Sequence, residues 1–246
     1  MTMMYQAVFK ILTSFRTAFS PELVSRYALN DMTQLRQLIY RLGKYSFFLA
    51  GALLVPLCLN MDAILDVWIG QKVPEFTSSF CTLSLISAAI DCIAVPGLVC
   101  NQATGNVRNF NIIWSLILMS NLPLAILFLV ESQWAPAVFV SRIIISGTAL
   151  IFITYMMHRQ IRLSIPRYLI QSILHPAMIL LPSLAAALWV RHVSDSAIAA
   201  IYADTGIFWL LFSISVFALG LDADERKAFA TKLSATVPLR RAKKTL

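Results

Sequence analysis

Long apolar runs alternate with short polar segments along almost the whole chain. Six of the runs hold about 20 mainly apolar residues each, which is enough to cross a bilayer as a helix. They are too long for the strands of a membrane barrel and lack the two-residue alternation of such strands. A seventh run, at the start of the chain, is shorter and more polar. The expected spans are 1–19, 46–66, 78–100, 111–131, 136–157, 168–190 and 198–220.

This pattern predicts an all-α, polytopic membrane helix bundle of about seven transmembrane helices over residues 1–220. Residues 221–246 then form a basic cytoplasmic tail. The composition agrees, because 59% of the residues are hydrophobic and 13% are charged, whereas soluble globular proteins carry about 25% charged residues. A chain surrounded by lipid needs an apolar exterior as well as an apolar core, which explains the shortage of charge.

The distribution of Lys and Arg predicts the orientation of the spans. If the first segment ends in the cytoplasm, residues 20–45 form a cytoplasmic loop, and most of the 20 basic residues lie on the cytoplasmic side. Only Lys72 and Arg191 lie on the other side, a bias expected from the positive-inside rule. The same bias explains the net charge of +8 without a nucleic-acid partner. The basic tail can also touch anionic membrane lipids.

No catalytic or metal-binding motif is visible. The four cysteines have no CxxC spacing and lie in or beside apolar runs, so we interpret them as packing residues. Paired carboxylates, a phosphate-binding glycine loop and a GxSxG turn are all missing from the sequence. We therefore expect no enzyme, no cofactor and no metal site.

The first segment carries a polar stripe at helical spacing. Gln6, Lys10, Ser14 and Thr17 recur every three or four residues and fall on one face of a helix. Such a face suits a helix that lines a water-filled cavity, and it makes these four residues candidates for contact with a substrate. Alternatively, Lys10 extends to the membrane surface or pairs with a carboxylate.

Two ionisable residues lie deep inside other spans. Asp91 is far from both ends of the 78–100 span, and Arg142 lies about two turns inside the 136–157 span. Charged groups in a membrane are costly and usually face a cavity or a partner. Arg142 suits the recognition of phosphate through its planar set of donors. Asp91 could relay a proton or carry one, and the two residues could equally form an Arg–Asp pair.

Several segments together resemble a known transporter family. They are FRTAFSPELVSRYALNDMTQLRQLIYRLGKYSFFL (15–49), AILDVWIGQKVPEF (63–76), CNQATGNVRNFNIIW (100–114) and NLPLAILFL (121–129). In this order they are similar to the second half of Wzx-type O-antigen or capsular polysaccharide flippases. That family belongs to the multidrug/oligosaccharidyl-lipid/polysaccharide exporter superfamily, whose members include the MATE transporters.

The resemblance implies a fold, a function and a partner. It implies the second of two helical bundles around a central cavity, the arrangement that supports alternating access in many transporters. The implied function is to move undecaprenyl-pyrophosphate-linked oligosaccharide across the bacterial inner membrane, with the C-terminus in the cytoplasm. Seven spans would place the N-terminus outside, so we expect a missing N-terminal half or a separate partner bundle. Lys10 and Arg142 are then candidates for binding the pyrophosphate, and Asp91 for coupling to ions.

Three other functions stay open. A cation-coupled multidrug exporter of the same superfamily would favour acidic cavity residues. A non-transporting membrane scaffold or remnant of the glycan assembly machinery would need none of these side chains. A membrane glycosyltransferase or polymerase would need long outer loops rich in Arg or carboxylates, and such loops are not visible in the sequence.

Overall fold

The computed structural model describes residues 2–70, 73–103, 107–132, 135–193 and 197–220. Within these ranges every regular element is a helix, which confirms the predicted all-α class. The elements are α1 (Thr2–Ala28), α2 (Met32–Leu59), α3 (Met61–Ile69), α4 (Thr77–Ala103), α5 (Val107–Met119), α6 (Asn121–Ser132), α7 (Ala137–Ile161), α8 (Ile165–Leu169), the π-helical turn η1 (Ile170–Leu174), α9 (His175–Val193), α10 (Ala197–Ser215) and the π-helical turn η2 (Val216–Gly220).

Six stretches of the described chain are long and apolar enough to cross a membrane. They are Met32–Leu59, Thr77–Ala103, Val107–Glu131, Ala137–Ile161, Ile165–His192 and Ile201–Gly220. Each overlaps a predicted span. Residues 2–19 of the first predicted span, 1–19, lie within the long helix α1, which is not among the six. A multi-pass membrane bundle is therefore supported, and the count of seven spans stays a prediction.

The predicted loop over residues 20–45 is wrong, because nearly all of it is helical. α1 continues to Ala28 and α2 begins at Met32. Asn30 makes the reversal with a φ of 57°, a left-handed conformation that Asn adopts more readily than most residues. Asp31 caps α2 by accepting a hydrogen bond from the backbone N–H of Gln34 at 3.1 Å. The left-handed Asn30 and the Asp31 cap thus form a tight turn between two helices, where the distribution of Lys and Arg predicted a long loop.

Two predicted spans contain breaks that periodicity did not reveal. The 46–66 span ends at Leu59, and the chain bends at Asn60 into α3. The 111–131 span is divided at Ser120 into α5 and α6. The predicted tail, 221–246, lies outside the described residues, and so do Thr104 and Gly105 of the segment 100–114 that resembles the flippase family.

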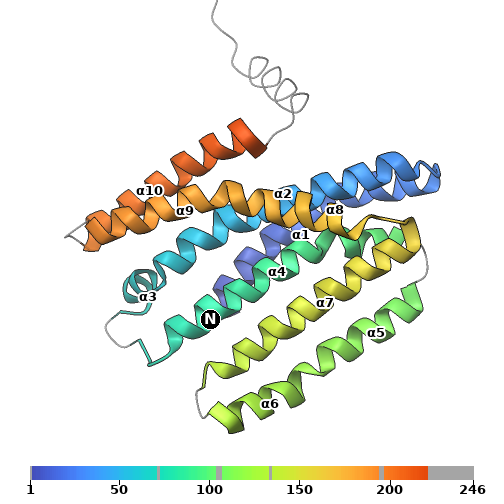
Figure 1. Cartoon of the computed structure of the whole chain (residues 1–246). Coiled ribbons are helices and arrows are strands. Elements are labelled where there is room, and N and C mark those ends of the chain that lie inside the picture. Colours follow the sequence, from blue (N-terminus) through green and yellow to red (C-terminus); the bar gives the residue numbers. More distant parts are fainter. Residues whose placement is uncertain (1, 71–72, 104–106, 133–134, 194–196, 221–246) are drawn as a thin grey trace, which may run out of the picture.

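The helices pack side by side in an extended arrangement (Figure 1). α9 and α10 pack against α2, α2 packs against α4, and α4 packs against α7. α5 and α6 cover the far side of α7 at the lower edge, and α1 lies behind α2 and α4. One core cluster joins α1, α2, α4 and α7 through Leu23, Leu42, Val99 and Ile153. A separate cluster joins α2, α9 and α10 through Phe48, Leu180 and Phe208.

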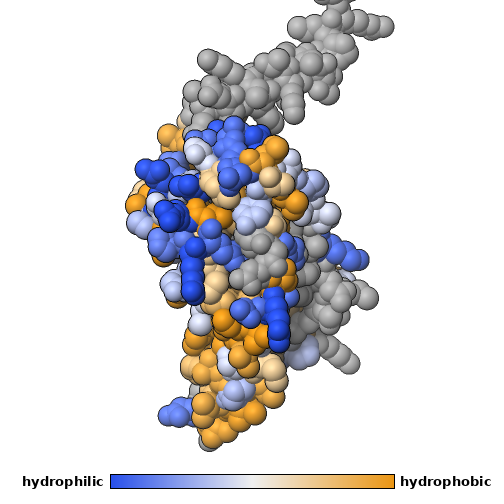
Figure 2. Space-filling view, turned by 90° about the vertical axis from the view of Figure 1, so that its right-hand side faces the viewer, coloured by the Kyte–Doolittle hydropathy of each residue, from blue (hydrophilic) through white to orange (hydrophobic). Residues whose placement is uncertain are grey.

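One end of the bundle is rich in exposed arginines. The α1–α2 hairpin, the end of α4 and the α7–α8 turn gather at the right-hand end in Figure 1. Figure 2 looks onto this end and shows hydrophilic side chains over its upper part, with apolar surface below. We call it the cationic end. Its exposed arginines are Arg41, Arg108, Arg159, Arg162 and Arg167.

Candidate functional site

The α4–α7 interface holds the two ionisable residues that the sequence singled out. The helices can approach closely because Gly97 of α4 faces α7. A Cβ atom added at Gly97 would lie 2.0 Å from Cγ2 of Ile153 and 3.1 Å from Cε of Met157. In lipid there is no hydrophobic driving force between helices, so their association depends on van der Waals packing. Small residues at the contact allow the helix backbones to approach closely enough for it. The close packing sets the distance between the side chains that the two helices carry.

Asp91 and Arg142 form an ion pair across this interface. Nη2 of Arg142 donates to Oδ2 of Asp91 at 2.8 Å. Asp91 lies in the middle of α4, whereas Arg142 lies in the second turn of α7. The side chains keep 24% and 30% of their surface exposed, respectively. The sequence left several roles open for these two residues, and in the structure they form the Arg–Asp pair.

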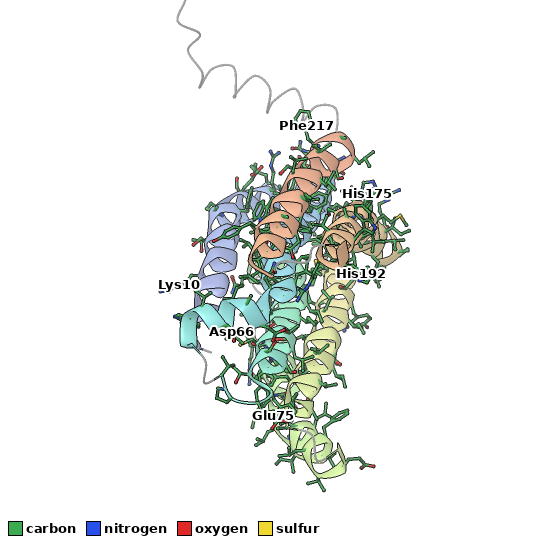
Figure 3. All side chains as sticks on the ribbon, turned by 90° about the vertical axis from the view of Figure 1, so that its left-hand side faces the viewer. Lys10, Asp66, Glu75, His175, His192 and Phe217 are labelled. Atoms are coloured by element: carbon green, nitrogen blue, oxygen red, sulfur yellow. The ribbon has the colours of Figure 1, made fainter. Side chains whose placement is uncertain are left out.

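The other predicted residues lie on α1, away from that interface. Lys10, Ser14 and Thr17 are all exposed, and the hydroxyl of Ser14 donates to the carbonyl of Lys10 at 2.9 Å. Figure 3 shows Lys10 at the outer edge of α1. The side chain of Gln6 lies outside the description. The structure thus brings two of the six predicted residues into contact and places three on a polar strip of α1.

A cationic cleft that sequence reasoning missed opens at the cationic end. It has a volume of about 430 Å³ and lies between α2, η1, α9 and η2. Lys44 is only 8% exposed, with Nζ 5.2 Å from the ring centroid of Tyr45. The lining residues are Gln37, Tyr40, Arg41, Lys44, Gln171, His175 and Gly220.

The cleft combines two basic side chains with amides, a phenol and an imidazole. Such donors can bind the oxygens of a phosphate or another anion. Gln37, Tyr40, Arg41 and Lys44 lie three or four residues apart on α2, so they share one helical face. That spacing was the one clue to the cleft in the sequence. The partners of these four residues come from more than 125 positions later in the chain, which no local pattern indicates. His175 is exposed and lines this cleft.

A second cleft, of about 400 Å³, is apolar. Its walls come from α2, α4 and α9 and include Phe47, Leu54, Ile90 and Leu184. α2 therefore lines the cationic cleft with its first half and the apolar cleft with its second half. Together the two clefts offer separate surfaces for an anionic group and for hydrocarbon.

A third polar cluster joins the bend after α2 to α10. Asp204 is 1% exposed, and its Oδ1 accepts hydrogen bonds from Nδ2 of Asn60 at 3.3 Å and from Oγ1 of Thr205 at 3.2 Å. Asp204 was not among the predicted site residues. Its position inside the 198–220 run was a sufficient signal, since an acidic residue in a span is rarely accidental.

Metal-binding groups are sparse in the part of the chain that the structure describes. There, no three residues among His, Cys, Asp and Glu gather closely enough to hold a metal ion. All four cysteines are free thiols, and Cys81, Cys92 and Cys100 are buried, as packing residues would be.

Comparisons with family models, with curated proteins and with solved structures gave no match. The resemblance to polysaccharide flippases consequently stays a prediction, and the function has to be argued from the site.

Proposed function

We propose that the chain is one helical bundle of a transporter that moves undecaprenyl-pyrophosphate-linked oligosaccharide across a bacterial inner membrane. The observation that carries this proposal is the partly exposed Asp91–Arg142 pair in a bundle of apolar helices. A charge pair facing lipid would lose most of its hydration, which is expensive. The exposed part of the pair therefore has to face water or protein. A cavity shared with a second bundle meets this requirement.

The polar strip of α1 supports the same cavity. Lys10, Ser14 and Thr17 are exposed on a helix that packs within a membrane bundle. A partner bundle opposite this strip would enclose it in a hydrated space. The family resemblance supplies such a bundle in the form of a first half of the transporter, encoded upstream or separately.

The two clefts lined by α2 fit an amphipathic substrate. The cationic cleft suits a pyrophosphate and the apolar cleft suits an isoprenoid tail. A multidrug exporter is a weaker candidate, because Asp91 is already paired with Arg142 and is not an acidic site for a cationic drug.

The orientation is part of the proposal. With the cationic end in the cytoplasm, the positive-inside rule is satisfied by Arg41, Arg108 and Arg159, and Arg191 lies at the opposite end of α9. The tail after Gly220 would then be cytoplasmic as well.

The test is a set of chromosomal variants in the bacterium that carries the gene, so that any partner bundle is present. We expect Arg142→Ala and Lys10→Ala to reduce surface glycan and to leave lipid-linked oligosaccharide on the inner leaflet. Arg159→Ala is the matched control, because Arg159 lies on the same helix as Arg142 but at its exposed end. Unchanged surface glycan in both Arg142→Ala and Lys10→Ala, at normal protein levels, would reject the proposal.

A further inference from the structure

The cluster around Asp204 contains more hydrogen-bond acceptors than donors. Nδ2 of Asn60 points at three oxygens: the carbonyl of Pro56 at 3.3 Å, Oδ1 of Asp204 at 3.3 Å and Oγ1 of Thr205 at 3.2 Å. An amide nitrogen has only two hydrogens for these three acceptors. All three distances are at or just beyond the long end of the N–H···O range, which indicates shared, weak bonds.

The second carboxylate oxygen is left without a donor. Oδ2 of Asp204 is buried and has no hydrogen-bond partner among the described residues. Arg191 donates to the backbone carbonyl of Leu59, next to Asn60, and does not pair with Asp204. A buried carboxylate without a cation or a full set of donors is costly.

We propose that this cluster is a binding site for a monovalent alkali cation. Turning the Asn60 amide by half a turn would place Oδ1 where Nδ2 now stands. The oxygens of Pro56, Asp204 and Thr205 would then lie 3.2–3.3 Å from Oδ1 of Asn60, a spacing that oxygens bound to one cation can have. Four oxygens so close repel one another unless a cation lies among them, and oxygen is the ligand that hard cations prefer.

The charge of the cluster selects a monovalent ion. Among the described residues of the cluster Asp204 is the one carboxylate, so one positive charge neutralises it. Arg191 is exposed and donates to the carbonyl of Leu59, so it does not pair with Asp204, and a divalent ion would leave a net positive charge in the buried cluster. The bound ion would join α10 to the bend between α2 and α3, and this role does not depend on what the protein transports.

The experiment uses the full chain, purified in detergent micelles. Its thermal unfolding is followed in NaCl and in KCl, with choline chloride keeping the ionic strength constant. A ligand that binds only the folded state stabilises it by RT ln(1 + [L]/Kd), so above Kd the midpoint rises with the logarithm of the ligand concentration. We expect such a rise with one of the two alkali ions, and not with choline.

Variants then locate the site. Asp204→Asn is expected to abolish the response, and Thr205→Val to raise at least tenfold the salt concentration at which the midpoint begins to rise. Asp66→Asn is the matched control, since Asp66 is an exposed aspartate on α3 at the same end of the molecule (Figure 3). If Asp204→Asn fails to fold, two measurements decide in its place. They are the response of Thr205→Val and the binding of radioactive sodium or rubidium to the wild type. The same midpoint in alkali and choline salts, or an unchanged response in the variants, would overturn the proposal.

Discussion

Asp91 and Asp204 both lie inside helices long enough to cross a membrane, yet their surroundings are opposite. Asp91 keeps 24% of its side-chain surface and is paired with Arg142 at 2.8 Å. Asp204 is 1% exposed, and its contacts are with an amide and a hydroxyl. The first carboxylate is neutralised by the protein and faces outward. The second is enclosed and lacks a protein cation among the described residues.

The difference separates two uses of charge inside a membrane protein. A paired and partly exposed charge can serve a hydrated surface, where a substrate or a partner bundle replaces lipid. An enclosed charge with surplus oxygens needs a small ion to balance it. We therefore propose different roles for the two aspartates on the basis of their neighbours, transport for Asp91 and ion binding for Asp204.

The largest effect is expected when Arg142 is removed. Arg142→Ala leaves Asp91 without its counter-charge, and we expect the free energy of unfolding to fall by about 1–3 kcal/mol, because the pair is only partly desolvated. We also expect transport to fall at least tenfold. Chemical unfolding in detergent and accumulation of the lipid-linked substrate would measure the two losses.

The double variant Asp91→Asn/Arg142→Gln sharpens this test. It removes both charges and keeps hydrogen-bonding groups, so most of the stability should return while transport stays low. Recovery of transport together with stability would mean that the pair only holds α4 against α7.

The next effect concerns the packing that brings Asp91 to Arg142. Gly97→Val would force a branched side chain against Ile153 and Met157, and we expect a loss of about 1–3 kcal/mol in unfolding free energy. Gly147→Ala is the control, because a Cβ there meets nothing within 4 Å. Since Ala is a better helix former than Gly, that variant should be neutral or slightly more stable. Equal stability of the two variants would show that the close α4–α7 contact is not needed.

Six of the seven predicted spans overlap long apolar helices, because lipid imposes a simple condition on composition and length. The helix ends were not predictable, because they depend on local contacts such as the cap at Asp31 and the left-handed Asn30. The Asp91–Arg142 contact was one of several alternatives, because the sequence does not show that α4 packs against α7. The cationic cleft was hidden because Lys44 and Gln171 are distant in sequence and meet only in the fold.

A smaller effect is expected at the donor that serves Asp204. Asn60→Ala removes the amide that contacts Pro56, Asp204 and Thr205. In choline chloride we expect a loss of about 1–2 kcal/mol, because the oxygens lose a donor in a buried site. Asn111→Ala, at an exposed position of α5, should change stability by less than about 0.5 kcal/mol. Similar losses in both would remove the contrast between the two aspartates.

The smallest effect on stability, and the sharpest on function, is expected at Lys10. The side chain is exposed on α1, so Lys10→Ala should change the unfolding free energy by no more than about 0.5 kcal/mol. If the strip of Lys10, Ser14 and Thr17 lines the cavity that Arg142 faces, loss of this cation should slow transport several-fold at an unchanged protein level. Lys10→Arg should restore the rate, because it keeps the charge and the reach of the side chain. A transport rate that is unchanged in Lys10→Ala would place Lys10 at the membrane surface, and the proposed cavity would then be supported by the Asp91–Arg142 pair without Lys10.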